Sequence, residues 1–287
     1  WGVSFFSGLK IAPEDMKFTA DKYYDDYNLM DIRIVSTLGL TEADLEEINR
    51  IQGVKESFGT YTLDALTSYD DKEIVLRVHG YSSEDQINGF NFIEGRLPKK
   101  PNECLAEVGY ENITNIPIGT NINLHPNKNG SLEEDLENTE FKVVGTVQTP
   151  YYLSFEKGSS NMGNGKVGNF IIIPQENFKL EVFTDIFVTV EGVKELNSYK
   201  DEYFDVVDNV TNSLKELAKD REKIRYDELI SEAREELEDG KKEYYEEKSK
   251  ADEKLADALK EIEDAKIDIQ KGEKELKDKE NEFYASI

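Results

Sequence analysis

Residues 163–168, Gly-Asn-Gly-Lys-Val-Gly, fit the glycine pattern of a dinucleotide-binding loop. In such a site the glycines follow a strand and open a helix, because the helix N-terminus receives the pyrophosphate. Here the glycines precede the apolar residues 170–173, which predict a strand. Lys166 is followed by Val167, whereas a phosphate-binding P-loop needs Ser or Thr at that position. The pattern therefore predicts a glycine-rich loop and no nucleotide site.

Nucleophilic catalysis needs a base beside a Ser, Thr or Cys. His79 falls within a predicted strand and His125 precedes Pro126 in a predicted turn, and neither has a G-x-S-x-G or Cys-His signature to pair with. Cys104 lies in the apolar phase of a predicted strand, which favours a small buried hydrophobe. Carboxylate pairs carry no signal, because 61 acidic residues guarantee accidental ones. We therefore expect no catalytic and no cofactor-binding residue in this segment.

The composition excludes further classes. The 287 residues include 35 Lys and Arg against 61 Asp and Glu, a formal net charge of −26. Nucleic acid is not expected as a partner, since affinity for it comes mainly from neutralising phosphates. One Cys and two His cannot form a Cys/His zinc cluster, so no metal site is expected. No run of about 18 apolar residues occurs, and the chain opens with Trp1, as expected for a segment of a longer protein.

The composition changes near residue 220. Residues 221–287 contain no Pro and only two glycines, and they mix Ala, Glu, Lys and Leu densely. That mixture predicts a long solvated helix. We therefore divide the chain into a head, residues 1–221, and an arm, residues 222–287, which would be roughly 100 Å long at ~1.5 Å per residue.

Apolar residues recur along the arm at intervals of three and four, which is typical of a coiled-coil seam. An extra four residues between Tyr244 and Leu255 predict a stutter. Small residues such as Gly240 and Gly272 alternate with the large ones, so a partner helix could approach closely. That helix would belong to another chain or to a segment outside these residues. The large seam residues, which we expect to bind the partner helix, are Ile230, Leu237, Tyr244, Leu255, Ile262, Ile269, Leu276 and Phe283.

The head begins with aromatic residues beside glycines in residues 1–16, typical either of a chain leaving a membrane or of a buried N-terminal segment. Residues 29–35 alternate like a half-buried strand. Thr41 predicts the N-cap of a helix that stops at Gly53. Strands are expected over residues 54–66 and 73–81, which gives the order β-α-β-β.

Short strands and turns follow. They predict a small β subdomain inserted over about residues 90–175, with strands at 103–108, 121–124, 141–147 and 170–173. A strand at 186–190 and a helix at about 193–217 would then complete the first layer. The fold class is therefore α+β, with a βαβ layer, an inserted β subdomain and a long coiled-coil helix.

Several segments of the head occur in an order that resembles a known family, the extracytoplasmic domain of FtsX-like or MacB-like ABC transporter permeases of Gram-positive type. The segments are Gly8-Leu9-Lys10, Asp15-Met16, Thr19-Ala20-Asp21-Lys22-Tyr23-Tyr24, Leu29-Met30-Asp31-Ile32, Ser36-Thr37-Leu38-Gly39-Leu40-Thr41, Gly53-Val54 and Glu94-Gly95-Arg96-Leu97-Pro98. The likeness covers the head to about Tyr226, and the arm resembles one half of the helical hairpin inserted in many such permeases.

The resemblance implies a MacB-like core fold on the extracellular face of the cell membrane, without an active site of its own. ATP would be hydrolysed by a separate cytoplasmic ATPase subunit, reached through the permease membrane helices. The domain would couple that hydrolysis to export or extraction, or to regulation of a cell-envelope protein or peptide partner. From another class, a secreted or surface structural or adhesive protein that self-associates through its helical arm remains the alternative.

Overall fold

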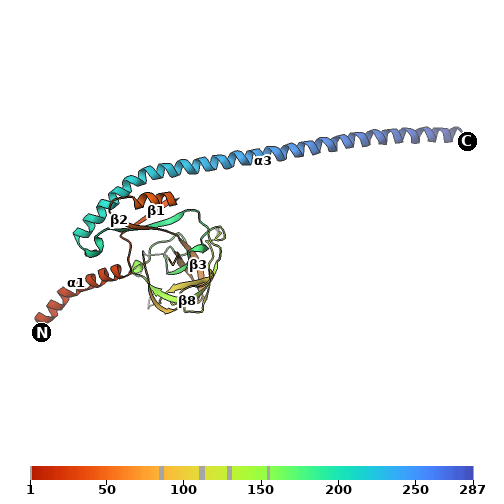
Figure 1. Ribbon diagram of the computed structural model, residues 1–287. Helices are drawn as coiled ribbons and strands as arrows, with labels where there is room; N and C mark the ends of the chain where they lie inside the picture. The colour runs from red at the N-terminus through yellow and green to blue at the C-terminus, as the bar shows by residue number, and fades with distance from the viewer. Residues whose placement is uncertain (1, 84–86, 110–113, 128–130, 154–155, 287) are drawn as a thin grey trace. The chain divides into compact units, whose positions relative to one another are not determined.

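The computed structural model describes residues 2–83, 87–109, 114–127, 131–153 and 156–286. The chain divides into two compact units, Trp1–Glu222 and Lys223–Ile287, with the boundary one residue later than expected. From here on, head and arm denote these two units. The head combines two β-sheets with helices, so the α+β class expected from the sequence is confirmed (Figure 1). Among the described residues, no helix is both long and apolar enough to cross a membrane.

Three α-helices occur in the described chain: α1 (Gly2–Asp26), α2 (Glu42–Asn49) and α3 (Asp201–Ala285). Helix α2 begins as expected, with Thr41 as its N-cap. The Thr41 hydroxyl accepts from the Asp44 backbone while the Asp44 carboxylate accepts from the Thr41 backbone, a capping box. Helix α3 is a single helix of 85 residues, which confirms the helical arm.

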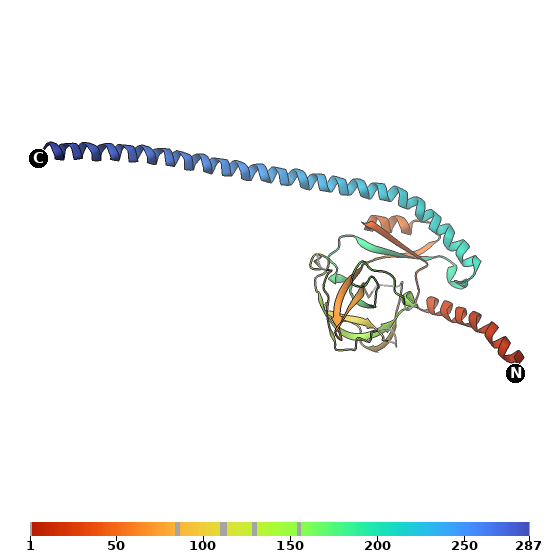
Figure 2. The ribbon, with the colours of Figure 1, turned by 180° about the vertical axis from the view of Figure 1, so that it is seen from behind.

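The first sheet has three antiparallel strands in the order β1 (Ile32–Leu40), β10 (Phe183–Val190), β2 (Val54–Thr60). One face packs against α2 and the first turns of α3 (Figures 1 and 2). The central strand β10 sends Ile186 and Val188 into this core, where they meet Ile48 of α2 and Val210 of α3. Because successive side chains of a strand alternate, the neighbouring Phe187 faces the other side of the sheet.

The second sheet has seven strands in the order β3-β4-β9-β6-β8-β5, with β7 also paired to β8. Its two sides approach each other where Leu66 and His125 exchange backbone hydrogen bonds of 2.9 Å, so the sheet curls around its own core. The strands are β3 (Thr62–Tyr69), β4 (Lys72–Tyr81), β5 (Asn91–Gly95), β6 (Glu103–Glu107), β7 (Asn121–Asn123), β8 (Glu140–Gln148) and β9 (Asn169–Pro174).

Strand β9 shows how the second sheet buries both faces. Ile171 and Ile173 point into the curled core beside Leu76, whereas Phe170 and Ile172 belong to a smaller apolar cluster on the opposite face. A strand buried on both faces reads as a continuous apolar run, as residues 170–173 do.

Several expected boundaries are wrong. The single strand expected over residues 54–66 is two strands interrupted at Tyr61, because the chain leaves one sheet there and enters the other. Strands β3 and β4 accordingly belong to the seven-stranded sheet and not to the first layer. Strand β5 was not expected.

The helix expected from about residue 193 is a 3-10 turn, η3 (Val193–Glu195), and the α-helix begins only at Asp201. Residues 2–26 form a helix that the sequence did not predict. Trp1 lies outside the described residues, as do the side chains of residues 2–13, and Met16 and Phe18 are exposed.

Candidate functional site

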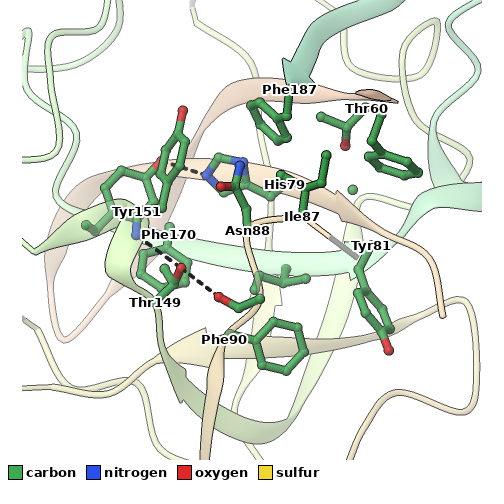
Figure 3. Close-up of a pocket in the computed structure, with 15 residues that line it drawn as sticks. Thr60, His79, Tyr81, Ile87, Asn88, Phe90, Thr149, Tyr151, Phe170 and Phe187 are labelled. Carbon is green, nitrogen blue, oxygen red and sulfur yellow. Dashed lines mark hydrogen bonds between the residues drawn. The ribbon is translucent and has the colours of Figure 1, made fainter. Parts of the chain in front are cut away.

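A cavity of ≈ 250 Å³ lies between the two sheets of the head (Figure 3). It receives residues from β2 and β10 of the first sheet, from β4 and β9 of the second, and from two connecting segments, 87–90 and 149–152. The residues that line it are Phe58, Thr60, His79, Gly80, Tyr81, Ile87, Asn88, Gly89, Phe90, Thr149, Tyr151, Tyr152, Phe170, Ile172 and Phe187.

The strand register explains why aromatic side chains gather there. Phe58 of β2 lies directly opposite Phe187 of β10, and directly opposed residues point to the same face of a sheet. Phe170 of β9 stacks on Tyr152, with ring centroids 4.9 Å apart. The ring of Tyr151 lies 6.0 Å from that of Phe187, which belongs to the first sheet. The cavity is therefore framed by rings that the two sheets contribute separately.

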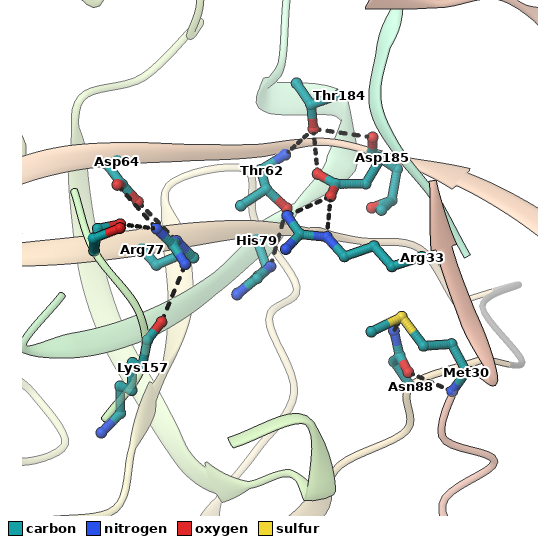
Figure 4. A network of polar contacts seen from close by, with 12 residues as sticks. Met30, Arg33, Thr62, Asp64, Arg77, His79, Asn88, Lys157, Thr184 and Asp185 are labelled. Carbon is teal, nitrogen blue, oxygen red and sulfur yellow. Dashed lines mark hydrogen bonds and ion pairs between the residues drawn. The ribbon is translucent and has the colours of Figure 1, made fainter. Parts of the chain in front are cut away.

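His79 is the histidine among the described residues that line this cavity. Its Nδ1 lies 3.2 Å from the Thr62 hydroxyl (Figure 4). Its Nε2 lies 2.6 Å from the Tyr152 hydroxyl, so both ring nitrogens are engaged. Burial lowers the pKa of the imidazole to about 4. His79 is consequently neutral near pH 7 and forms hydrogen bonds with Tyr152 and Thr62.

A polar network behind His79 connects the sheets. The Thr62 backbone of β3 donates to the Thr184 hydroxyl of β10 at 2.6 Å, and Thr184 donates to Asp185 at 2.7 Å. Arg33 of β1 pairs with the same carboxylate at 2.6 Å. The positive charge of Arg33 is paired with the negative charge of Asp185, so neither is a free ionic group for the cavity. The hydrogen bonds of Thr62 and Thr184 connect the two sheets.

The rim of the cavity is fastened to the end of α1. The backbone of Asn88 donates to the Asn28 carbonyl at 2.9 Å, and the backbone of Gly89 donates to the Tyr27 carbonyl at 2.8 Å. Thr149 donates to the Gly89 carbonyl at 3.2 Å, which joins the two connecting segments (Figure 3). The segment that follows α1 therefore sets the position of the rim.

Helix α1 is also tied to the chain that leads into α3. The Ser198 backbone donates to the Asp21 carboxylate at 2.7 Å, and the hydroxyls of Tyr24 and Tyr199 lie 3.0 Å apart. Just after α1, Asp31 accepts from the Tyr203 hydroxyl at 2.6 Å. Burial raises the pKa of the Asp31 carboxyl. The first helix and the beginning of the last one are thus joined at one end of the first sheet.

The motif residues singled out from the sequence lie elsewhere. Gly163 and Gly165 adopt positive φ in the loop before β9, as expected of a glycine-rich loop. Cys104 is fully buried, which confirms the expected hydrophobe, and burial raises the pKa of its thiol. His125 contributes its backbone to the contact with Leu66. Within the described ranges, no group of three or more His, Cys, Asp or Glu could hold a metal ion.

All eight predicted seam residues lie on α3 within the arm. Ile230 is half-buried, whereas the other seven, from Leu237 to Phe283, are each 57% to 70% exposed. A Cβ built at Gly240 or Gly272 meets no other atom within 4 Å. Packing inside this chain therefore does not explain why these two positions are glycine.

Sequence reasoning missed the cavity, because its residues come from six separate segments. A local signal existed only at residues 149–152, where Thr-Pro-Tyr-Tyr predicts a capped turn carrying two aromatic rings. Thr149 does accept the Tyr151 backbone hydrogen bond. Which rings would meet these two depends on the pairing of strands far apart in the chain.

Comparison with known protein families and with curated proteins finds no match. Among solved structures, the chain is similar to the extracellular domain of the noncanonic ABC-type transporter YknZ from Gram-positive bacteria, with 11% identity and a TM-score of 0.33 over 62% of this chain and 87% of that chain. It is also similar to the periplasmic region of MacB from Actinobacillus actinomycetemcomitans, with 13% identity and a TM-score of 0.34 over 65% of this chain and 75% of that chain.

Proposed function

We propose that this chain is a non-catalytic extracellular domain of an ABC transporter permease. In this role it passes the movement driven by a cytoplasmic ATPase to a substrate or a cell-envelope partner. The ordered series of head segments described above supports the class.

The observation that carries the proposal is the connection of α1 to the beginning of α3. Asp21 and Tyr24 of α1 bond to Ser198 and Tyr199, which directly precede α3. When membrane helices move such a domain, the displacement reaches it first through the segment that connects it to the membrane. In this chain we take that segment to be α1. In this chain such a displacement would reach the beginning of α3 through these bonds, without crossing the core of the seven-stranded sheet.

The first experiment is to read the encoding gene on both sides of the segment. We expect about 20 consecutive apolar residues before Trp1, and a return helix followed by further membrane spans after Ile287. A gene in which neither side encodes a membrane span would overturn the proposal.

The coupling step is tested in the full-length permease reconstituted with its ATPase subunit. Asp21→Cys removes the acceptor of this hydrogen bond, and Ser198→Cys allows a disulfide to take its place. Among residues 1–287 the only native cysteine is the buried Cys104. We expect reduced Asp21→Cys/Ser198→Cys protein to lose transport severalfold while its ATPase persists, and oxidation to restore coupling. Arg96→Cys/Glu103→Cys, at an ion pair elsewhere in the head, is the control, and its oxidation should not restore coupling. Unchanged transport in the reduced protein would contradict the coupling.

The second candidate is a structural or adhesive protein that pairs through its arm, and the exposed seam favours it. It predicts a stable dimer at micromolar concentration that Ile262→Lys or Leu255→Lys abolishes in sedimentation analysis. Ile267→Lys is the matched control, because Ile267 lies on the opposite side of the helix and is also exposed. A monomer throughout would exclude self-association and leave the permease proposal standing.

A further inference from the structure

The cavity between the sheets is uncharged, although one third of the chain is charged. Among the described residues that line it there is no Asp, Glu, Lys or Arg. The nearby arginines Arg33 and Arg77 are paired with Asp185 and Asp64. An ion entering this space would lose its hydration without gaining a counter-charge, which is costly. The walls therefore select against charged ligands.

The walls also favour a ring. The rings of Phe58, Phe90, Phe187, Tyr81 and Tyr151 line the space, and the last four are labelled in Figure 3. Aromatic pairs gain stabilisation beyond the area they bury, through offset-stacked and edge-to-face arrangements. An apolar cavity of about 150 Å³ holds a benzene molecule, so ≈ 250 Å³ leaves room for a larger single ring system.

We propose that this cavity is a binding site for one uncharged aromatic group of about the size of an indole, carried by a small molecule or by a peptide side chain. The rim residues Asn88 and Gly89 hold the site open at the end of α1. The inference stands independently of the proposed function, since it concerns this chain alone and its test needs neither a membrane nor an ATPase.

The test titrates residues 1–287 with three matched probes: indole, the anion indole-3-acetate and the cation tryptamine. Binding is followed by calorimetry and by NMR shifts of the His79 ring. We expect saturable binding of indole with a Kd below about 1 mM and at least tenfold weaker binding of both ions. Absence of saturable indole binding, or equal binding of the ions, would overturn the proposal.

Two variants locate the site. Phe58→Trp places a larger ring into the cavity and Phe187→Ala removes a wall, and each should weaken indole binding at least tenfold. Phe204→Ala truncates an exposed phenylalanine of α3 that is not among the lining residues, and should leave binding unchanged. Urea unfolding of each variant separates loss of the site from loss of the fold. Indole binding that survives Phe58→Trp in a folded protein would place the ligand elsewhere and overturn the assignment.

A fourth probe identifies the source of the ring. The capped neutral peptide acetyl-Gly-Trp-Gly-amide presents the same indole on a backbone. Binding at least as tight as that of indole supports a peptide side chain, and exclusion of the peptide with retention of indole supports a small molecule. Peptide binding that Phe58→Trp leaves unchanged would contradict occupancy of this cavity.

Discussion

The side-chain oxygen of Asn88 accepts a hydrogen bond from the backbone nitrogen of Met30 at 2.9 Å, across a sequence separation of 58 residues. Asn88 adopts φ 58°, a left-handed conformation that Asn tolerates better than most residues. Asn88 thus joins the segment that follows α1 to the rim of the cavity.

Replacing Asn88 should destabilise the head through two effects that can be measured separately, a lost hydrogen bond and backbone strain. Asn88→Gly keeps the backbone conformation but leaves the Met30 N–H unpaired, which should cost about 1–2 kcal/mol. Asn88→Ala should cost about 1 kcal/mol more, because Ala is strained at positive φ. Urea unfolding followed by near-UV circular dichroism measures both. Asn88→Asp, which keeps the acceptor oxygen, is the control, and a stability of Asn88→Gly equal to that of the native chain would contradict the role.

His79 should make the head less stable in acid. Burial lowers its folded-state pKa to about 4, whereas an exposed histidine titrates near 6.5. Between these values the unfolded state binds more protons, so the free energy of unfolding falls as pH drops from about 6.5 to about 4. His79→Gln should flatten that dependence, by at most ~1.4 kcal/mol per pH unit.

The same titration can be observed directly. The His79 ring protons should shift in NMR spectra with a midpoint near pH 4, provided the head is still folded. A midpoint of 6 or above would show that the imidazole is hydrated and would remove the basis of the prediction.

Asp44 should make the stability of the first layer depend on pH. Burial opposes its charge, but hydrogen bonds from Thr41 and Arg221 keep its pKa below the usual value. Its stabilisation is therefore present above the ordinary carboxyl pKa and is lost as pH falls through the lowered one. We expect Asp44→Ala to cost about 2–3 kcal/mol, from the lost cap and the unpaired arginine.

A control for Asp44 lies close by. Lys219 and Glu216 form an ion pair on α3 that is largely exposed, and Lys219→Ala should change the stability by less than about 0.5 kcal/mol. Equal losses for Asp44→Ala and Lys219→Ala would show that the contact with Arg221 contributes nothing specific.

Alanine substitutions at Gly39 and Gly192 allow the cost of backbone strain to be measured separately from the cost of steric overlap. Gly39 has φ 76°, and a Cβ there would lie 2.2 Å from Val182 Cγ2. Gly192 has φ 78° but no atom within 4 Å of its Cβ position. Gly192→Ala should therefore cost about 1–2 kcal/mol for strain, and Gly39→Ala should cost about 1–3 kcal/mol more for overpacking. Thermal unfolding compares them, and equal losses would show that Val182 moves aside freely.

Local chemistry predicted several elements of this fold. The cap at Thr41, the strand predicted over residues 73–81 and the continuous apolar run at 170–173 were each indicated by neighbouring residues alone. What sequence could not predict is the assignment of strands to sheets. Residues 54–66 read as one continuous strand, and only the pairing of Phe58 with Phe187 and of Leu63 with Val78 places the two halves in different sheets.

The cavity escaped prediction for the same reason. Its aromatic residues are unremarkable along the chain, because each one fits an ordinary strand or turn. His79 was noticed as a possible base, and its partners decide its role: Thr62 is 17 residues away and Tyr152 is 73 residues away. Contacts at such separations follow from the topology and not from spacing.

Arg221, which donates a hydrogen bond to Asp44, is the second-last residue of the head. Among the described residues, the apolar clusters of the head include none beyond Leu217. These apolar clusters therefore do not depend on the length of the arm. Whole seven-residue repeats could be added to or removed from the arm while the head stays unchanged, so evolution or an engineer could alter the reach of the protein independently of its cavity.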